Sequence, residues 1–297
     1  MPTRFRTVTI ATTLALATAE ALAGTAQAST TKLVKDIEPD GSSTPVEFRG
    51  MGGKAYFSAR TAAHGRELWK TDGTPKGTKL VRDISPGAGD SNPSELTLVR
   101  GTLFFVAGRI DTGRELWKTD GSPKGTKLVK DILGGPGGSF PQDLTAYDGK
   151  LYFLTQIGSE DTYLWRSDGT PKGTKRIRKI ASVDAPDPSW LQRAGGLLYM
   201  RGHDRTHGME LWRSDGTYKG TRMVKDLRPG PQGANPRNGV AVAGGKVLFS
   251  AAVGKGFELY RTNGTAKGTK LLKDIAPGGD SSSPRDLTTV GKNAFFS

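Results

Sequence analysis

The chain has 297 residues, a formal net charge of +14 and no cysteine. The absence of cysteine excludes disulfide bonds, thiolate metal sites and lipid attachment through an N-terminal cysteine. No stretch beyond the first 28 residues approaches 18 consecutive apolar residues, so the sequence indicates no membrane-spanning helix there.

Residues 1–28 have the pattern of a secretory signal peptide. Arg4 and Arg6 form a short positive region, Val8–Ala23 is mostly apolar, and Ala26-Gln27-Ala28 is a small-residue cleavage pattern. We expect cleavage near Ala28–Ser29 and a secreted, extracellular or cell-surface protein. Residues 29–297 are long enough to bury a core as a single domain.

The rest of the chain is a repeat. Asp-Gly pairs begin at Asp72, Asp120, Asp168 and Asp215, an Asn-Gly pair begins at Asn263, and the steps between them are 48, 48, 47 and 48 residues. In the second complete unit we expect four strands, at 94–100, 102–107, 114–119 and 126–132, because these runs are rich in Val, Leu, Phe and Trp and are bounded by turn residues. Four strands in 47–48 residues predict an all-β fold, a β-propeller of five complete four-stranded blades.

A sixth blade is expected to be split and incomplete. Residues 31–37 match the fourth strand of a unit, and residues 284–297 match the first two strands, with Phe296 at the position of Phe105. No stretch matches the third strand of this blade. Five blades with loose ends, six blades with a defective seam, and a truncated chain are all compatible with this pattern.

Two recurring features of each unit have structural interpretations. Trp69, Trp117, Trp165, Trp212 and Tyr260 hold the same place in successive units, and we expect them to pack in the core between blades. The Asp-Gly pairs are expected to build hairpin turns, because Gly supplies a positive φ and Asp accepts hydrogen bonds from nearby backbone amides.

The third complete unit departs from the others. Tyr163 replaces the Glu that precedes Leu-Trp, and Lys179 replaces the Asp of the fourth strand. Such a departure indicates either a binding site for a specific partner or drift that the array tolerated.

The phrase Glu-Leu-Trp-x-Ser/Thr-Asp-Gly-Thr, followed by Gly-Thr and Leu-Val-Lys-Asp-Ile, resembles the ELWxxDGT repeat family of exported bacterial proteins, also described as hyalin-like. The resemblance extends over nearly all of residues 31–297. It implies an exported repeat protein and carries no settled activity. The hairpin is also similar to the Asp-box turn of sialidase-type propellers, where that turn is a structural device.

The loops between second and third strands, with those between blades, share one face of a propeller and are the candidate ligand-binding loops. Their polar residues are His64, Arg66, Arg109, Asp111, Arg114, Glu160, Asp161, His203, Asp204, Arg205 and His207. We expect no metal site and no cofactor. Asp83 with Asp90, and Asp274 with Asp280, offer oxygens to Ca²⁺, although other units lack this spacing.

The opposite face carries a repeated pair of cations. If the blades form a ring, these pairs make a basic rim, which would attract an anionic cell-wall or matrix polymer; the alternative is that repetition copied a soluble turn. The rim residues are Lys76, Lys79, Lys124, Lys127, Lys172, Lys175, Lys219, Arg222, Lys267 and Lys270. Nucleic acid is not expected, because aromatic residues are not interleaved with these cations.

The sequence shows no catalytic constellation, so the main hypothesis is an exported, non-catalytic binding or adhesion protein for a surface or matrix polysaccharide or another anionic polymer. A neutral-sugar lectin is a variant of this hypothesis. The alternative is a carbohydrate-active enzyme, a glycosidase or lyase, that uses acids of the variable loops. The acids available in those loops are Asp111, Glu160, Asp161 and Asp204.

Overall fold

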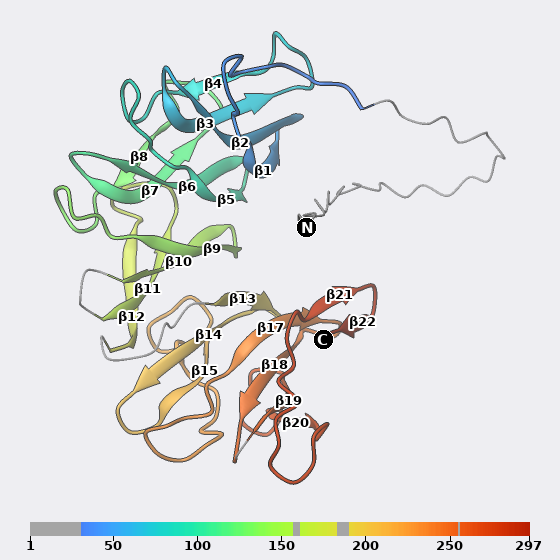
Figure 1. The fold of residues 1–297 in the computed structure, drawn as a ribbon. Helices are drawn as coiled ribbons and strands as arrows, with labels where there is room; N and C mark the ends of the chain where they lie inside the picture. Colours follow the sequence, from blue (N-terminus) through green and yellow to red (C-terminus); the bar gives the residue numbers. More distant parts are fainter. Residues whose placement is uncertain (1–30, 157–160, 183–189, 255) are drawn as a thin grey trace, which may run out of the picture. The chain divides into compact units, whose positions relative to one another are not determined.

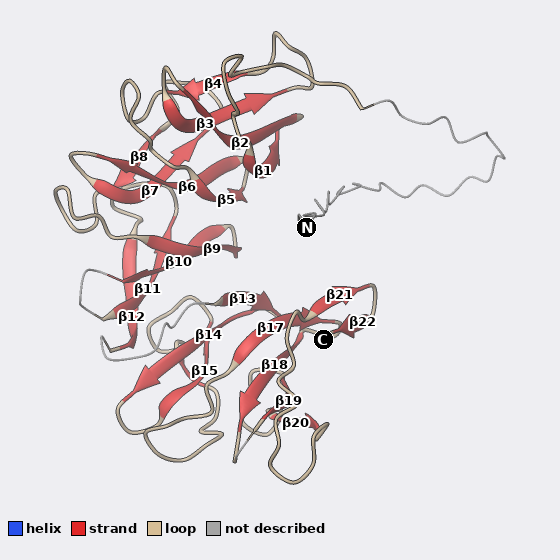
Figure 2. Ribbon diagram, viewed as in Figure 1, coloured by secondary structure: helices blue, strands red, loops and turns tan. Residues whose placement is uncertain are grey.

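A computed structural model describes residues 31–297 apart from 157–160, 183–189 and 255. The predicted signal peptide therefore lies outside the described residues. The chain consists of two compact units, Met1–Leu33 and Val34–Ser297, and the second contains all of the strands. Within the described ranges the secondary structure consists of strands and contains no helix (Figures 1 and 2). Accordingly, none of the described residues belongs to a helix long and apolar enough to cross a membrane.

Five sheets have four antiparallel strands each, hydrogen-bonded in chain order. The first contains β1 (Val46–Met51), β2 (Lys54–Thr61), β3 (Gly65–Thr71) and β4 (Lys79–Arg82). The second contains β5 (Ser94–Val99), β6 (Thr102–Arg109), β7 (Gly113–Thr119) and β8 (Lys127–Lys130). The third contains β9 (Pro141–Tyr147), β10 (Lys150–Gln156), β11 (Thr162–Ser167) and β12 (Lys175–Ala181).

The fourth sheet contains β13 (Leu191–Ala194), β14 (Leu197–Asp204), β15 (Gly208–Ser214) and β16 (Arg222–Met223). The fifth contains β17 (Arg237–Val242), β18 (Lys246–Ala252), β19 (Phe257–Thr262) and β20 (Lys270–Lys273). A last sheet pairs β21 (Thr288–Val290) with β22 (Asn293–Phe295). The first strands of successive sheets contact one another from β1 through β5, β9, β13 and β17 to β21 (Figure 1). The β-propeller prediction is confirmed, with five four-stranded blades and a partial sixth.

The Asp-Gly pairs build the hairpin turns, as predicted. In the second blade, Asp120 Oδ1 accepts hydrogen bonds from the Ser122 amide at 2.8 Å and from its hydroxyl at 2.7 Å. Thr119 Oγ1 lies 2.7 Å from Thr126 Oγ1 across the hairpin and accepts a bond from the Gly121 amide at 2.8 Å. The same bonds recur in the other four blades, so the loop is fixed by its own side chains.

The core lies between neighbouring blades. The five aromatic residues expected there are at most 7% exposed, and Trp117 is 1% exposed. Trp117 belongs to one buried cluster with Phe105 of its own sheet and with Tyr56 and Leu68 of the preceding one. Each blade therefore buries its third strand only when a neighbour is present, which is why the units fold as an array.

A β-bulge in the first strand recurs in the first, second, third and fifth blades, and the sequence did not indicate it. In β5 the register with β6 shifts between Ser94 and Thr97, and Glu95 in the bulge has φ 60°. Glu47, Asp143, Asn238 and Asp286 have φ values of 54–61° at the same position. The bulge directs the Glu95 carboxylate to the next blade, where it accepts a bond from the Leu144 amide at 3.2 Å.

Residues 31–37 do not form the predicted strand. They nevertheless make fourth-strand contacts, because Lys35 Nζ donates to the Thr78 carbonyl at 3.0 Å, just as Lys130 Nζ of the second blade donates to the Thr174 carbonyl at 3.2 Å. Ile37 packs on the cluster of Phe57 and Trp69. The segment is not a β-strand, because no strand among the described residues forms backbone pairs with it.

Candidate functional site

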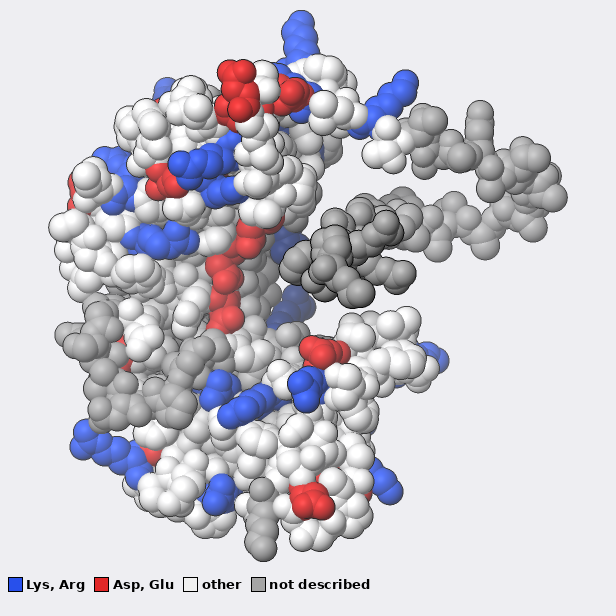
Figure 3. All heavy atoms as spheres, in the orientation of Figure 1, with Lys and Arg blue, Asp and Glu red and all other residues white. Residues whose placement is uncertain are grey.

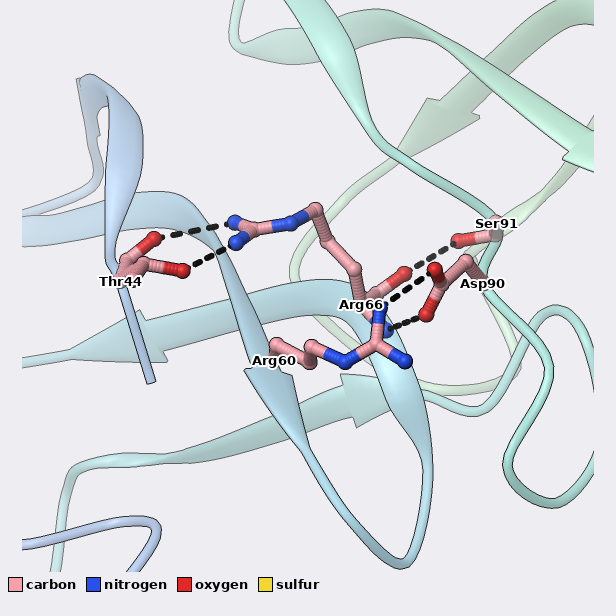
Figure 4. Close-up of polar contacts among 5 residues, drawn as sticks. All are labelled: Thr44, Arg60, Arg66, Asp90 and Ser91. Atoms are coloured by element: carbon pink, nitrogen blue, oxygen red, sulfur yellow. Dashed lines mark hydrogen bonds and ion pairs between the residues drawn. The ribbon is translucent and has the colours of Figure 1, made fainter. Parts of the chain in front are cut away.

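The first variable loops are held by internal contacts. The Arg66 guanidinium binds the carbonyl and hydroxyl of Thr44, and its amide donates to Asp90 Oδ1 at 2.7 Å (Figure 4). Arg60 donates to the other oxygen of Asp90 at 2.7 Å. His64 Nδ1 lies 3.0 Å from Asp83 Oδ2. These side chains tie the second-to-third loop of one blade to the connection that leads to the next blade.

The equivalent residues of the second blade act similarly. Arg114 donates to the Asn92 carbonyl at 3.1 Å and to Ser94 Oγ at 2.8 Å, and burial lowers its pKa. Arg109 forms a bidentate pair with Asp111, with one Nε–Oδ1 distance of 2.9 Å. Glu160 lies outside the described residues. The structure therefore does not gather these predicted residues into one site.

The glutamate of each Glu-Leu-Trp phrase has a role that sequence reasoning missed. In the first blade, Glu67 is fully buried and accepts bonds from the Ser85 amide at 2.9 Å and from Ser91 Oγ at 2.6 Å. Glu115, Glu210 and Glu258 hold the corresponding connections. We call these four residues the clamp glutamates; each fixes the loop that leads from its own blade to the next.

The clamp glutamates differ in their proton affinity. Burial raises the pKa of Glu67 and Glu210 to about 7 and that of Glu115 to about 6. Burial acts in the same direction on Glu258, but bonds from the Ile275 amide and Ser282 outweigh it, so that its pKa lies below the ordinary value. The Asp-Gly turns carry carboxylates of the opposite kind, since hydrogen bonds from Thr74 lower the pKa of Asp72.

A pocket of about 550 Å³ lies between the third and fourth blades. It is lined by the two departures noted in the sequence, Tyr163 and Lys179, and by two more. Arg176 stands where other blades have Leu or Met, and Tyr218 stands in the hairpin where other blades have Pro or Ala. We call these four residues the departure residues. They come from β11, β12 and the hairpin after β15, and the fold brings them to one cavity.

Arginine and aromatic side chains stack in this pocket. The Arg176 guanidinium lies 4.5 Å from the Tyr163 ring centroid. That of Arg178 lies 4.8 Å from the Tyr218 ring and 5.7 Å from the Trp212 ring. Such stacking holds a guanidinium in a fixed plane. Arg178 also donates to the Tyr218 carbonyl at 3.3 Å, and its other N–H groups are of the kind that bind a carboxylate or sulfate.

Three predicted residues line the same pocket, namely His203, Asp204 and Arg205. His203 Nδ1 is buried and has no hydrogen-bond partner among the described residues. Asp204 accepts bonds from the amides of Thr206 and His207, and its carboxylate lies 2.9 Å from His207 Nδ1. Burial would raise the pKa of Asp204, but these bonds bring it below the usual value, and the contact raises the pKa of His207.

The position of Trp212, which lines the pocket, depends on a glycine. A Cβ atom on Gly202 would lie 2.5 Å from the Trp212 ring, so the indole can rest on this backbone only because no side chain is present. Asp161, the remaining predicted acid, lies beside the pocket and binds Lys179 Nζ at 2.7 Å. The residues that sequence reasoning missed here are Arg176, Arg178, Trp212 and Tyr218.

All ten predicted rim cations are exposed. On the face shown in Figure 3, basic side chains are dispersed among acidic and uncharged ones and do not merge into one patch. Among the described residues there is no cluster of three or more His, Cys, Asp or Glu side chains suited to a metal ion. Asp83 and Asp90, considered for Ca²⁺, bind His64 and Arg60 instead.

No protein-family model matches the chain, and no curated protein matches it. Solved structures do resemble it. One is a prolyl endopeptidase with 14% sequence identity and a TM-score of 0.53. The matched region covers 86% of this chain and 39% of the endopeptidase chain. A puromycin-hydrolyzing peptidase of Mycobacterium tuberculosis is 11% identical with a TM-score of 0.50, covering 78% of this chain and 39% of its own. A putative exo-β-1,3-galactanase from Bifidobacterium bifidum is 12% identical with a TM-score of 0.36, covering 78% of this chain and 92% of its own.

These comparisons correct one expectation. Peptidases are among the solved structures that resemble the chain, and this finding stands against the expectation of a protein that is not an enzyme. The chain spans about 39% of the length of the peptidases. At identities of 11–14% the likeness establishes the propeller fold and does not transfer a reaction or a substrate.

Proposed function

We propose that this is an exported carbohydrate-active protein whose pocket between the third and fourth blades binds an acidic polysaccharide. The observation that carries the proposal is the meeting of all four departure residues in one cavity. Drift would leave substitutions scattered over the exposed positions of a repeat. Here two aromatic rings and two cations replace Glu, Pro, Leu and Asp at positions that the fold brings together.

The chemistry of the pocket suits an anionic sugar. Guanidinium groups bind carboxylates and sulfates with two parallel hydrogen bonds, and aromatic faces pack against the C–H groups of a sugar ring. Arg178 and Tyr218 are stacked at 4.8 Å, which orders both groups before a ligand arrives. A ligand hydroxyl would also satisfy the buried Nδ1 of His203.

The enzymatic form of this proposal favours elimination over hydrolysis. A glycosidase requires two carboxyl groups on either side of the glycosidic bond, and among the described lining residues only Asp204 has one. An elimination requires a cation that neutralises the carboxylate of a uronic acid, and a base for the proton on the adjacent carbon. Arg176, Arg178 and His203 offer these kinds of group. The ring carbon loses this proton, the C4–O bond breaks, a C4–C5 double bond forms, and the leaving oxygen takes up a proton.

The decisive experiment measures both binding and turnover. Purified protein is titrated with polygalacturonate, alginate and a neutral polysaccharide over a series of salt concentrations, while the ultraviolet absorbance of the C4–C5 double bond is followed. The variants Arg176→Leu and Tyr218→Pro restore the residues of other blades, so we expect both to fold and to bind the acidic polymers at least about tenfold more weakly. Arg109→Gln, which removes a half-buried arginine of the second blade outside this pocket, should bind normally.

Equal binding by all three variants would contradict the proposal that this pocket binds the saccharide. Binding without formation of the double bond would support the recognition of an acidic saccharide and would refute the elimination reaction. The ELWxxDGT pattern and the predicted signal peptide support an extracellular or cell-surface location, and immunoblotting of culture medium and cell fractions tests it.

A further inference from the structure

A second pocket, of about 300 Å³, lies where the fifth blade meets the segment that leads into β21. Its walls come from β17, β18 and β19 of the fifth blade and from residues 283–285. Among the described residues that line it, two are arginines, Arg237 and Arg285, and none is acidic. Both arginines are exposed, so a ligand in solution has access to them.

The charge of this pocket differs from that at the same positions in earlier blades. Arg237 and Arg285 each follow the proline that leads into a first strand, and the corresponding residues of the first three blades are Val46, Ser94 and Gln142. Asn238 stands in the bulge, where those blades have Glu47, Glu95 and Asp143. Two cations thus replace neutral residues, and a neutral amide replaces a carboxylate.

An arginine and its partner exchange places in the fifth blade. In the second blade, Arg114 of the third strand donates to Ser94 Oγ at the start of the first strand, at 2.8 Å. In the fifth blade the first strand carries Arg237, and Phe257 has the position of Arg114. The Arg237 guanidinium lies 4.6 Å from the centroid of the Phe257 ring. Because a ring face contacts the plane of a guanidinium, this stack orders Arg237 without using one of its N–H groups.

Hydrogen bonds hold the segment that carries Arg285 against the fifth blade. Asn238 Nδ2 donates to the Pro284 carbonyl at 3.2 Å, and the Ser283 amide donates to the Phe257 carbonyl at 3.1 Å. The second of these bonds recurs between the second and third blades, both complete, where the Phe140 amide donates to the Arg114 carbonyl at 3.1 Å. The arrangement is therefore that of an ordinary junction between blades, and it brings the two arginines to one pocket before a ligand arrives.

We infer that this pocket binds one carboxylate or sulfate group through Arg237 and Arg285. A guanidinium binds such a group with two parallel hydrogen bonds, and two cations in a pocket whose described lining has no carboxylate favour an anion over a neutral ligand. The Phe257 ring adds an apolar wall that suits the carbon skeleton of an organic acid. This pocket shares no described lining residue with the one between the third and fourth blades, so the inference does not rest on the proposed function.

The test follows the side-chain N–H resonances of ¹⁵N-labelled arginine in the full chain by NMR during titration with sodium galacturonate, at low salt. The resonances of Arg237 and Arg285 are identified by their loss in Arg237→Ser and Arg285→Gln. We expect both resonances to shift saturably with galacturonate and not with neutral galactose. In Arg285→Gln, the shift of Arg237 should require about tenfold more galacturonate. The resonance of Arg109, in the second blade, is the internal control and should not move.

The two variants carry residues that other blades have at these positions, so both should fold, and an unchanged thermal unfolding curve checks this. Arg176→Leu, in the other pocket, should leave the shift of Arg237 unchanged. If Arg237 responds while Arg176→Leu and Tyr218→Pro bind acidic polymers normally, this inference holds and the proposed function fails. Weaker polygalacturonate binding by Arg237→Ser would support an anion that is part of a polymer, and a response to galacturonate alone would support a free sugar acid.

Four results would overturn the inference. They are the absence of a saturable shift of Arg237, equal shifts with galactose, an unchanged galacturonate affinity of Arg237 in Arg285→Gln, and loss of the Arg237 shift in Arg176→Leu. The last result would show that the signal comes from the pocket between the third and fourth blades.

Discussion

Replacing the clamp glutamate Glu67 by glutamine should remove the part of the pH dependence of stability that the Glu67 carboxyl causes. Glu67 is fully buried, and its pKa in the folded state is about 7 against an ordinary value of 4.5. Between these values the folded protein holds a proton that the unfolded chain has released. Stability from this group is therefore fully present below pH 4.5 and is lost as the pH rises toward and through 7.

The magnitude follows from the difference between the two pKa values. A difference of about 2.5 corresponds to about 3.4 kcal/mol in the free energy of unfolding, of which about 3 kcal/mol is lost between pH 4 and pH 8. Glutamine is neutral throughout this range, and its amide can accept from the Ser85 N–H and donate to Ser91 Oγ. As the pH rises from 4 to 8, we therefore expect the free energy of unfolding of Glu67→Gln to increase by about 3 kcal/mol relative to that of the wild type.

The assay is urea unfolding of both proteins at pH 4 to 8, followed by tryptophan fluorescence, with the denaturant slope checked for constancy. Glu258→Gln is an informative control, because the folded-state pKa of Glu258 is lowered and its contribution is present above pH 4.5 and lost on acidification. That variant should lose stability relative to wild type as the pH rises. If Glu67→Gln shows no gain, or follows Glu258→Gln, hydrogen bonds to the carboxylate outweigh its burial and the reasoning is refuted.

Three further perturbations test the packing of the blades. Trp117→Ala should lower the free energy of unfolding by about 3–5 kcal/mol in urea titrations, because the side chain is buried between two blades, and a loss under 1 kcal/mol would contradict this placement. Thr126→Val should cost about 1–2 kcal/mol by the same measurement, since it removes the hydroxyl that bonds Thr119 across the hairpin. Gly202→Ala should displace the Trp212 ring, lower the unfolding temperature and weaken saccharide binding in the pocket; unchanged binding would show that the indole does not shape the site.

Much of the fold could be predicted from the sequence because its determinants are local. The Asp-Gly turn is closed by residues within seven positions of one another, as the Thr119–Thr126 pair shows. The recurring tryptophans were correctly placed in the core because a large aromatic side chain at a fixed place in each repeat has few other uses. Strand boundaries were close as well: the expected 102–107 became Thr102–Arg109.

The features that could not be predicted depend on contacts between distant segments. Glu95 at φ 60° is unfavourable as an isolated residue, and the bulge exists because two strands and the next blade hold it. Glu67 looks like part of a strand signature, and its role depends on Ser91, which lies 24 residues further along the chain. Ser139 and Ser282 likewise follow Glu115 and Glu258 by 24 residues, but this spacing alone does not show that the two segments meet.

The third blade shows why a departure from a repeat has more information than the repeat itself. Tyr163 stands at the position of a clamp glutamate, so the third blade gives up the buried bonds that hold the equivalent connection elsewhere. In exchange the position presents an aromatic ring to Arg176, which itself replaces a partly buried leucine of the type of Leu128. Both substitutions lose packing or hydrogen bonds of the blade, and both add a group to the same cavity. A loss of structural contacts that is matched by a gain of aromatic and cationic groups is expected of a binding site, and this supports the proposed site between the third and fourth blades over the repeated rim.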